Sequence, residues 1–233
     1  MIDTEQQAEG VFAGRQITRI AAPPSGHRGP ASTAQGRQSR DRVLAAAVEL
    51  TTEAGIGRVR LAGIARRAGM SSGQVMHYFT SKEHILLEAL AWQEEQEARQ
   101  RRATLPAVTG VWRRLEQYVD LYMPTGPADP AWILWTQAWA LAPHDTDVGE
   151  FLNELWLPWG KDLAAIVQDG IEDGTLSHQV SPGDFAVSFC ALLDGFGILL
   201  LHQRPELPRE RLIELAMANA RAQLVPVPQP GAG

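Results

Sequence analysis

The sequence predicts an all-α protein. Apolar residues recur every three to four positions over most of the chain, no segment alternates convincingly between apolar and polar residues, and Gly or Pro stands at the ends of the periodic segments. The 233 residues, 45% of them hydrophobic, are enough for a buried core. We expect three N-terminal helices, two of them forming a helix-turn-helix, followed by a larger helical body.

The N-terminal helices are predicted from their apolar faces and from the residues that stop them. Val43, Ala47 and Leu50 share one face of a helix over 39–54, and Gly55 ends it. Two short helices follow over 61–68 and 72–79. A longer helix begins at about 80–82, where Thr80 and Glu83 have the spacing of a capping box, and continues to about 102.

The body is predicted to hold five further helices. Their approximate ranges are 111–123, 130–141, 146–173, 182–202 and 208–224. Pro158 lies inside the third of these ranges and is expected to kink or divide that helix, because proline lacks the amide hydrogen of a helical bond.

Composition limits the setting in which the protein works. Residues 1–36 and 225–233 are rich in Gly and Pro and are expected to form a disordered arm and a flexible tail. One cysteine excludes an intramolecular disulfide, and no signal-peptide pattern is present, so we expect a cytoplasmic protein. The longest apolar run, 185–201, contains Ser188 and Asp194, and we therefore expect no membrane span.

Charge is distributed unevenly along the chain. Between 37 and 82 there are eight Lys and Arg against three Asp and Glu, whereas 83–233 holds ten basic and 21 acidic residues. A basic module joined to an acidic body suggests that one end meets a polyanion. A chance fluctuation of surface charge explains the same numbers, and charge alone does not separate the two explanations.

Residues 61–82 fit the steric requirements of a helix-turn-helix. Such a motif needs a small residue where the helices cross, a glycine in the turn and an apolar residue that anchors the second helix. Ala65, Gly69 and Val75 supply these at suitable separations. The second helix then begins with the small polar residues of 71–74, which suit contacts to base edges and phosphates.

The stretch from Arg42 to Leu90 resembles the DNA-binding domain of the tetracycline-repressor-like (TetR/AcrR) transcriptional regulators. The residues that carry the resemblance are Gly55, Ile64-Ala65, Ala68-Gly69-Met70-Ser71, Gly73, Tyr78-Phe79, Ser81-Lys82-Glu83 and Leu86-Leu87. The body resembles, more weakly, the branch with choline-repressor-like C-terminal domains, through Trp132-x-x-Trp135 and Leu192-Leu193-Asp194-Gly195. The expected organisation is an arm over 1–36, a DNA-binding domain over 37–83 with its motif at about 60–79, a ligand-binding and dimerisation domain over 84–224, and a tail over 225–233.

The resemblance implies a set of DNA-contacting residues. Exposed positions of the recognition helix read base edges, and basic or hydroxyl side chains around it hold phosphates. The candidates are Arg37, Arg42, Arg60, Ser71, Ser72, Gln74, Val75, His77, Tyr78 and Lys82. Gln74 is expected to bond adenine, and Val75 to touch a thymine methyl group unless it is buried. Core packing for Tyr78 and a solvated helix cap for Lys82 are the alternatives.

Two positions depart from the family pattern. Met76 stands where a tyrosine is usual, which removes a phosphate donor that His77 is positioned to replace. Arg60 stands where threonine is usual at the start of the second helix, and loss of such a cap costs on the order of 1 kcal/mol.

Aromatic residues gather in the first half of the body. All seven tryptophans lie between 92 and 159, and a stripe of them falls on one helix. Such rings suit a pocket for an apolar or cationic ligand, although a bulky core is the simpler explanation for any one of them. The candidate ligand-binding residues are Met123, Trp132, Trp135, Trp139, Phe151, Trp156, Trp159, Cys190 and Asp194. Asp194 is the candidate charged anchor, with a solvent-facing or interfacial carboxylate as the alternative.

The resemblance implies a dimeric regulator released from its operator by a small effector. The last two long helices, with apolar residues such as Phe185, Phe189 and Leu193, are the expected dimer interface. We expect double-stranded DNA, an effector and a second copy of the chain as partners, and no cofactor, metal or membrane. An enzyme has little support, since no catalytic or metal-binding motif is present. A helical small-molecule-binding protein with a degenerate DNA-binding module is the alternative function.

Overall fold

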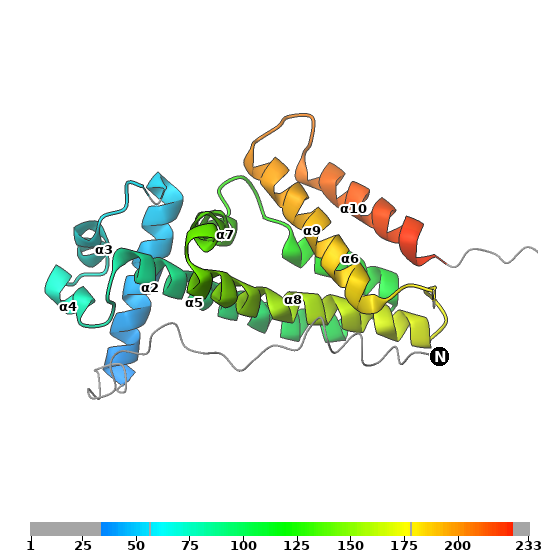
Figure 1. The fold of residues 1–233 in the computed structure, drawn as a ribbon, viewed down its shortest axis with the longest axis horizontal. Helices are drawn as coiled ribbons and strands as arrows, with labels where there is room; N and C mark the ends of the chain where they lie inside the picture. Colours follow the sequence, from blue (N-terminus) through cyan, green and yellow to red (C-terminus); the bar gives the residue numbers. More distant parts are fainter. Residues whose placement is uncertain (1–33, 56, 178, 226–233) are drawn as a thin grey trace, which may run out of the picture. The chain divides into compact units, whose positions relative to one another are not determined.

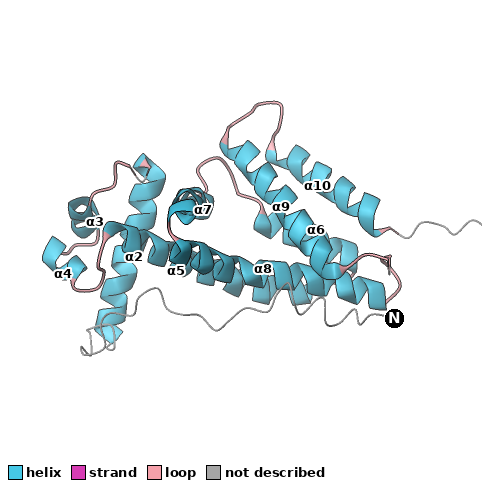
Figure 2. Cartoon of the chain, in the orientation of Figure 1, coloured by secondary structure: helices cyan, strands magenta, loops and turns pink. Residues whose placement is uncertain are grey.

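The computed structural model describes residues 34–55, 57–177 and 179–225, and over these the chain forms helices joined by turns, with no strand (Figures 1 and 2). This confirms the all-α prediction. Residues 1–33 of the predicted arm and residues 226–233 of the predicted tail lie outside the described residues. Residues 34–36, assigned to the arm from the sequence, belong instead to the first described helix.

The chain divides into two compact units. Within the described residues, the first unit comprises 34–97 and 128–155, and the second comprises 98–127 and 156–225. Helices α5 (Lys82–Thr104) and α8 (Thr146–Glu172) contribute residues to both. The first unit therefore contains more of the chain than the predicted DNA-binding domain.

The first unit is built around α2 (Ala34–Ala54). This helix packs against α3 (Leu61–Arg67) and α7 (Pro130–Leu141), and α3 packs against α4 (Ser72–Met76). The core of the unit is apolar and includes the fully buried Val43, Leu44, Ile64 and Val75. The short helices α3 and α4 lie beside α2 in Figure 1.

Ion pairs on the surface hold α2 to its neighbours. Arg67 donates to Glu49 at 2.8 Å and to Glu53 at 2.9 Å, and this hydrogen bond lowers the pKa of Glu53. Arg40 on α2 bonds Glu88 on α5. Burial raises the pKa of Glu88, but the hydrogen bond from His84 and the charge of Arg40 outweigh it, and the pKa lies below its usual value.

Helix α5 begins one residue later than the predicted capping box requires. Ser81 Oγ accepts the His84 amide at 3.0 Å, so Ser81 caps the helix, and the Thr80 amide donates to His84 Nδ1 at 3.2 Å. The predicted Thr80–Glu83 box is therefore wrong. The cap is the residue directly before the first helical one, and here Lys82 is that first residue.

The second unit contains α6 (Val111–Tyr122), α9 (Pro182–Leu201), α10 (Arg209–Leu224) and parts of α5 and α8. The short helix η2 (Leu105–Ala107) also belongs to it, whereas the short helix η3 (Ala142–His144) belongs to the first unit. Pro158 lies inside α8 without dividing it. Helix α10 packs against α6 and α9.

Helix α9 presents two different faces. Phe185, Phe189 and Leu193 are buried within the second unit, whereas Val187 and Ile198 on the opposite side are 42% and 36% exposed. The predicted assignment of the three buried residues to an intersubunit surface is therefore wrong, because they fill the core of their own chain. By length and composition, with a mean hydropathy of 1.9, α9 is also long and apolar enough to cross a bilayer, but core helices of soluble proteins meet the same criteria.

Candidate nucleic-acid interface and ligand site

The turn between α3 and α4 requires its glycine. Gly69 has φ of +69°, in the left-handed region, and nothing lies within 4 Å of where a Cβ would stand. The constraint is therefore the backbone conformation and not a lack of space. The Met70 amide donates to the Ala65 carbonyl at 2.9 Å and closes the turn.

A reciprocal capping box fixes the start of α4. Ser71 Oγ accepts the Gln74 amide at 3.2 Å, and Gln74 Oε1 accepts the Ser71 amide at 2.8 Å. The Gln74 carboxamide oxygen is therefore occupied within the helix. Bidentate bonding to adenine would have to use the second lone pair of that oxygen together with the Nε2 donor.

Of the residues from Ser71 to His77, one is buried and the others are exposed. Ser71, Ser72, Gln74 and His77 are exposed, as the sequence predicts for base-contacting positions. Val75 is 0% exposed, so the expected contact with a thymine methyl group is wrong. Its side chain points into the core of the first unit, which fixes α4 to the rest of that unit.

The predicted phosphate-binding residues differ in exposure. Arg37, Arg42 and Arg60 are exposed, whereas Tyr78 and Lys82 are half-buried. Arg60 occupies the cap position of α3 and makes no capping hydrogen bond with its side chain, as expected for a residue that replaces threonine. The Tyr78 ring lies beside the rings of His77 and Phe79, at centroid distances of 5.9 and 6.4 Å, and such local packing was the alternative expectation for this residue.

An open hollow of about 780 Å³ brings together five of the ten predicted DNA-contacting residues. It lies between the start of α2 and the start of α4, and its lining includes Arg42, Ser71, Gln74, His77 and Tyr78. Gln35 and Ser39 on α2 also line it. Sequence reasoning missed both: Gln35 was assigned to the arm over 1–36, and Ser39 was considered only as the start of the first helix.

The predicted ligand-binding residues fall into two groups, one in each unit. Trp132, Trp135 and Trp139 lie in the first unit, and Trp139 contacts the other two rings at centroid distances of 6.1 and 5.7 Å. The Trp135 indole N–H donates to Glu94, which is 5% exposed. Phe151 is half-buried in the same unit.

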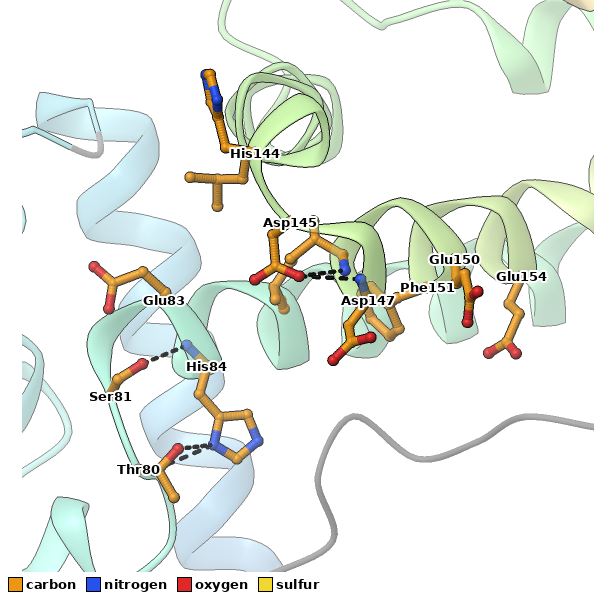
Figure 3. A pocket seen from close by; sticks show the side chains of 13 residues that line it. Thr80, Ser81, Glu83, His84, His144, Asp145, Asp147, Glu150, Phe151 and Glu154 are labelled. Carbon is orange, nitrogen blue, oxygen red and sulfur yellow. Dashed lines mark hydrogen bonds between the residues drawn. The ribbon is translucent and has the colours of Figure 1, made fainter.

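Phe151 lines a second hollow of the first unit, of about 580 Å³ (Figure 3). Five carboxylates line the same hollow, and they come from the start of α5, the α7–α8 connection and α8: Glu83, Asp145, Asp147, Glu150 and Glu154. Asp145 accepts the amides of Asp147 and Val148 and so caps α8. Across the described part of the chain, no group of three or more His, Cys, Asp or Glu residues is placed to hold a metal ion.

In the second unit, aromatic rings and polar groups form a connected cluster. The rings of Tyr118 and Tyr122 stack at 5.8 Å, and both meet the Trp159 ring edge-to-face, at 5.8 and 4.9 Å. The Tyr122 hydroxyl donates to Asp194 Oδ1 at 2.7 Å, and the Trp156 side chain bonds the same hydroxyl. The Tyr118 hydroxyl lies 3.3 Å from Cys190 Sγ. We call these six residues the aromatic cluster.

Burial shifts the acidity of the cluster. It raises the pKa of Asp194 to about 6, although the hydrogen bond from Tyr122 lowers it in part. It also raises the pKa of Cys190 to about 12, so the thiol stays protonated and unreactive. Desolvation likewise holds the pKa values of Tyr118 and Tyr122 well above their usual range, so both remain neutral donors.

Arg101, near the end of α5, adds a cation to this group. Its guanidinium carbon lies 3.6 Å from the centroid of the Trp159 ring, and its Nε–H donates to Asp162 at 3.0 Å. The residue is only 3% exposed. Met123, the remaining predicted ligand residue, is buried at the end of α6 in the same unit.

Two family models match this chain. Residues 43–89 match the model of the bacterial regulatory proteins of the tetR family, and residues 112–225 match that of the C-terminal domain of BetI-type transcriptional repressors. The chain belongs to the TetR family. The first of these matches covers the helix-turn-helix described above, and the BetI-type match covers most of the second unit. The TetR family consists of transcriptional regulators and not of enzymes.

Individual relatives agree with this assignment. The transcriptional repressor KstR from Rhodococcus jostii is 36% identical over 72 residues, which are 31% of this chain and 34% of KstR. The match to this TetR-family chain thus spans about a third of that repressor's length.

Solved structures share the TetR fold over most of the chain. A transcriptional regulator from Saccharomonospora viridis, solved in complex with choline, is 25% identical with a TM-score of 0.75, covering 82% of this chain and 100% of that one. A TetR regulator from Haloarcula marismortui is 19% identical with a TM-score of 0.71, covering 81% and 99%.

Sequence reasoning missed three residues of the second-unit site in this TetR-family protein. Tyr118, Tyr122 and Arg101 join Trp159 and Asp194, yet none stood out in the sequence. Tyr118 and Tyr122 are separated by four positions on one helix, which was a usable signal. Arg101 carried none, since a basic residue near the end of a helix is ordinarily solvated.

Proposed function

We propose that this protein is a dimeric repressor that binds a pseudo-palindromic operator and is released by a small cationic effector. The observation that supports the DNA-binding part best is the outer surface of α4. Its exposed polar side chains lie beside the basic start of α2, and the capping box and Gly69 hold the helix in a fixed orientation. A surface of this composition suits the major groove, with α4 as the recognition helix.

The outward face of α9 supports dimerisation. Val187, Ala191, Gly195 and Ile198 lie on that face, and nothing lies within 4 Å of a Cβ built at Gly195. Pairing this face with its symmetry copy removes apolar surface from water, and Gly195 allows close backbone approach. A two-fold dimer presents its recognition helices to half-sites one turn of DNA apart, about 34–36 Å. This dimer also accounts for the hydropathy of α9 without a membrane, in keeping with a cytoplasmic regulator.

The aromatic cluster supports a quaternary ammonium effector. Tyrosine and tryptophan rings attract such cations through their faces, and Asp194 supplies a carboxylate that Tyr122 orients. The Saccharomonospora relative with choline in its structure supports the same chemical class. The predicted ligand residues Met123, Trp156, Trp159, Cys190 and Asp194 belong to this proposal; the tryptophans of the first unit are proposed to serve its core.

The effector acts by shifting an equilibrium between two states of the dimer. It weakens operator binding only by as much as it prefers the free protein over the DNA-bound one. The test is a titration of choline into the protein bound to a DNA duplex that carries its preferred sequence, obtained by selection from a random library. The proposal is supported if choline releases the DNA at concentrations that also saturate the free protein. Equal choline affinity for free and DNA-bound protein contradicts a link between effector binding and operator release.

A helical small-molecule-binding protein with a degenerate DNA-binding module is the second candidate. The Arg60 cap position without a capping bond favours it, because the start of α3 is less well stabilised there. Sequence-selective, salt-sensitive binding to duplex DNA separates the two candidates in favour of the repressor.

Lys82→Ala is expected to reduce the salt dependence of operator binding without changing the preferred sequence. Each phosphate contact contributes about 0.9 to the slope of log K against log salt, so the slope falls by about one unit for each subunit that loses its contact. Affinities measured by fluorescence anisotropy at four salt concentrations give the slope. Glu83→Ala at the next position is the control. An altered base preference with an unchanged slope contradicts the phosphate role of Lys82.

Choline affinity is expected to fall as the pH is lowered. The Asp194 carboxylate is ionised above its pKa of about 6 and protonated below it, so its attraction for a cation is lost on the acid side. Between pH 7.5 and pH 5 we expect roughly a tenfold loss, measured by calorimetry. Asp194→Asn should bind choline weakly and independently of pH over this range. A pH-dependent affinity that persists in Asp194→Asn assigns the titration to another group.

A further inference from the structure

Arg101 has a donor that the fold does not use. The side chain is 3% exposed, and its Nη1 atom is fully buried with no hydrogen-bond partner. Asp162 accepts only from Nε, and the Asp162 side chain is itself 40% exposed. Buried guanidinium groups ordinarily satisfy both sides of their planar fork, because an unpaired buried donor loses its bonds to water without replacement.

This donor lies next to the aromatic cluster. The face of Trp159 carries the Arg101 guanidinium, and the same ring meets Tyr122, whose hydroxyl donates to Asp194. A positive and a negative group thus stand at the two ends of one series of contacts within the second unit.

We propose that the effector carries an anionic group in addition to its quaternary ammonium, and that Arg101 Nη1 binds this anion. The inference rests on the proposed effector site and names the second half of its ligand. A carboxylate or a phosphate oxygen satisfies the unused N–H groups of Nη1, and a charge-assisted bond in a buried setting is among the stronger hydrogen bonds in proteins. The ammonium group lies toward Asp194 and Tyr122, where the charge is of opposite sign.

Arg101 has a structural alternative, which is to clamp α5 to α8 through Asp162 and Trp159. In that role, removing the Arg101 side chain destabilises the fold and lowers the affinity for every ligand by the same factor. In the proposed role its removal abolishes the preference among ligands and leaves the shared cation contact in place. The two roles therefore differ in the ratio of affinities and not in any single affinity.

The test is calorimetry on the full-length protein with three ligands that share a trimethylammonium group. Choline has no anionic group, glycine betaine has a carboxylate and phosphocholine has a phosphate. We expect at least one of the two anionic ligands to bind about tenfold or more tightly than choline, and the tighter one identifies the class of anion. In Arg101→Gln this preference should disappear while choline affinity stays within about twofold.

Arg221→Gln is the matched control. Arg221 lies in the same unit, pairs with Glu116 at 3.2 Å and stands over the Trp112 ring, but it is exposed. Its replacement should leave the preference intact. Choline binding as tightly as both anionic ligands in the wild-type protein overturns the inference while the proposed function stands, as does an equal loss of all three in Arg101→Gln. Absence of binding for all three ligands overturns the quaternary ammonium effector itself.

Discussion

Replacing Ile198 by glutamate is expected to convert the dimer to a monomer and to weaken operator binding by about a hundredfold or more. Ile198 is one of the exposed large apolar residues of the outward face of α9. In a two-fold interface the substitution brings two carboxylates into apolar contact with the partner, and burying unpaired charge costs several kcal/mol. The resulting monomer binds one half-site at a time and loses the gain in affinity from binding two half-sites together. Each 1.4 kcal/mol of that gain corresponds to a tenfold change in affinity.

Light scattering coupled to size-exclusion chromatography gives the oligomeric state, and anisotropy with the selected duplex gives the affinity. Ala165→Glu is the control, since Ala165 is an exposed small residue on α8. That variant should remain a dimer with unchanged operator affinity. A dimeric Ile198→Glu protein with wild-type affinity contradicts the assignment of the interface to this face of α9.

Replacing Val75 by aspartate is expected to unfold the DNA-binding part of the first unit. Val75 is fully enclosed by apolar residues that include Ile64 and Phe79. An aspartate there has no partner of opposite charge in the core, and we expect a loss of about 3 kcal/mol or more in the free energy of unfolding. Specific DNA binding should be lost with the fold of the motif, and urea denaturation followed by circular dichroism measures the change.

Met76→Asp is a closely matched control for this substitution. Met76 is the next residue on the same short helix, and it is 44% exposed. The same charge placed there should change the free energy of unfolding by about 0.5 kcal/mol or less. It will also lower the affinity for DNA, because it repels the phosphates. A Val75→Asp protein as stable as Met76→Asp, with altered preference at one base pair, would return Val75 to the role of a base contact.

The helix-turn-helix was predictable because its determinants are local. Gly69 needs a positive φ, and the interval from Ala65 to Val75 is set by two short helices and one turn. A capping residue was harder to choose, since Thr80 and Ser81 are adjacent and equally suited to cap a helix. Only the position of the first helical residue decides between them.

The faces of α9 and the composition of the ligand site depend on contacts between distant segments. Phe189 and Val187 are both apolar, and packing of α9 against the rest of the second unit decides which of them is buried. Trp135 and Trp159 both looked like pocket residues, but they lie in different units of the structure. Their assignment needed the tertiary partners Glu94 and Tyr122, which lie 41 and 37 positions away in the sequence.

Selection of bound sequences from a random duplex library tests whether the protein is a sequence-specific dimeric regulator. The purified full-length protein is used at two salt concentrations. We expect an enriched pseudo-palindrome with half-sites about one helical turn apart, retained at the higher salt with reduced affinity. Absence of any enriched sequence, with weak binding that disappears as salt is raised, would contradict a sequence-specific dimeric regulator.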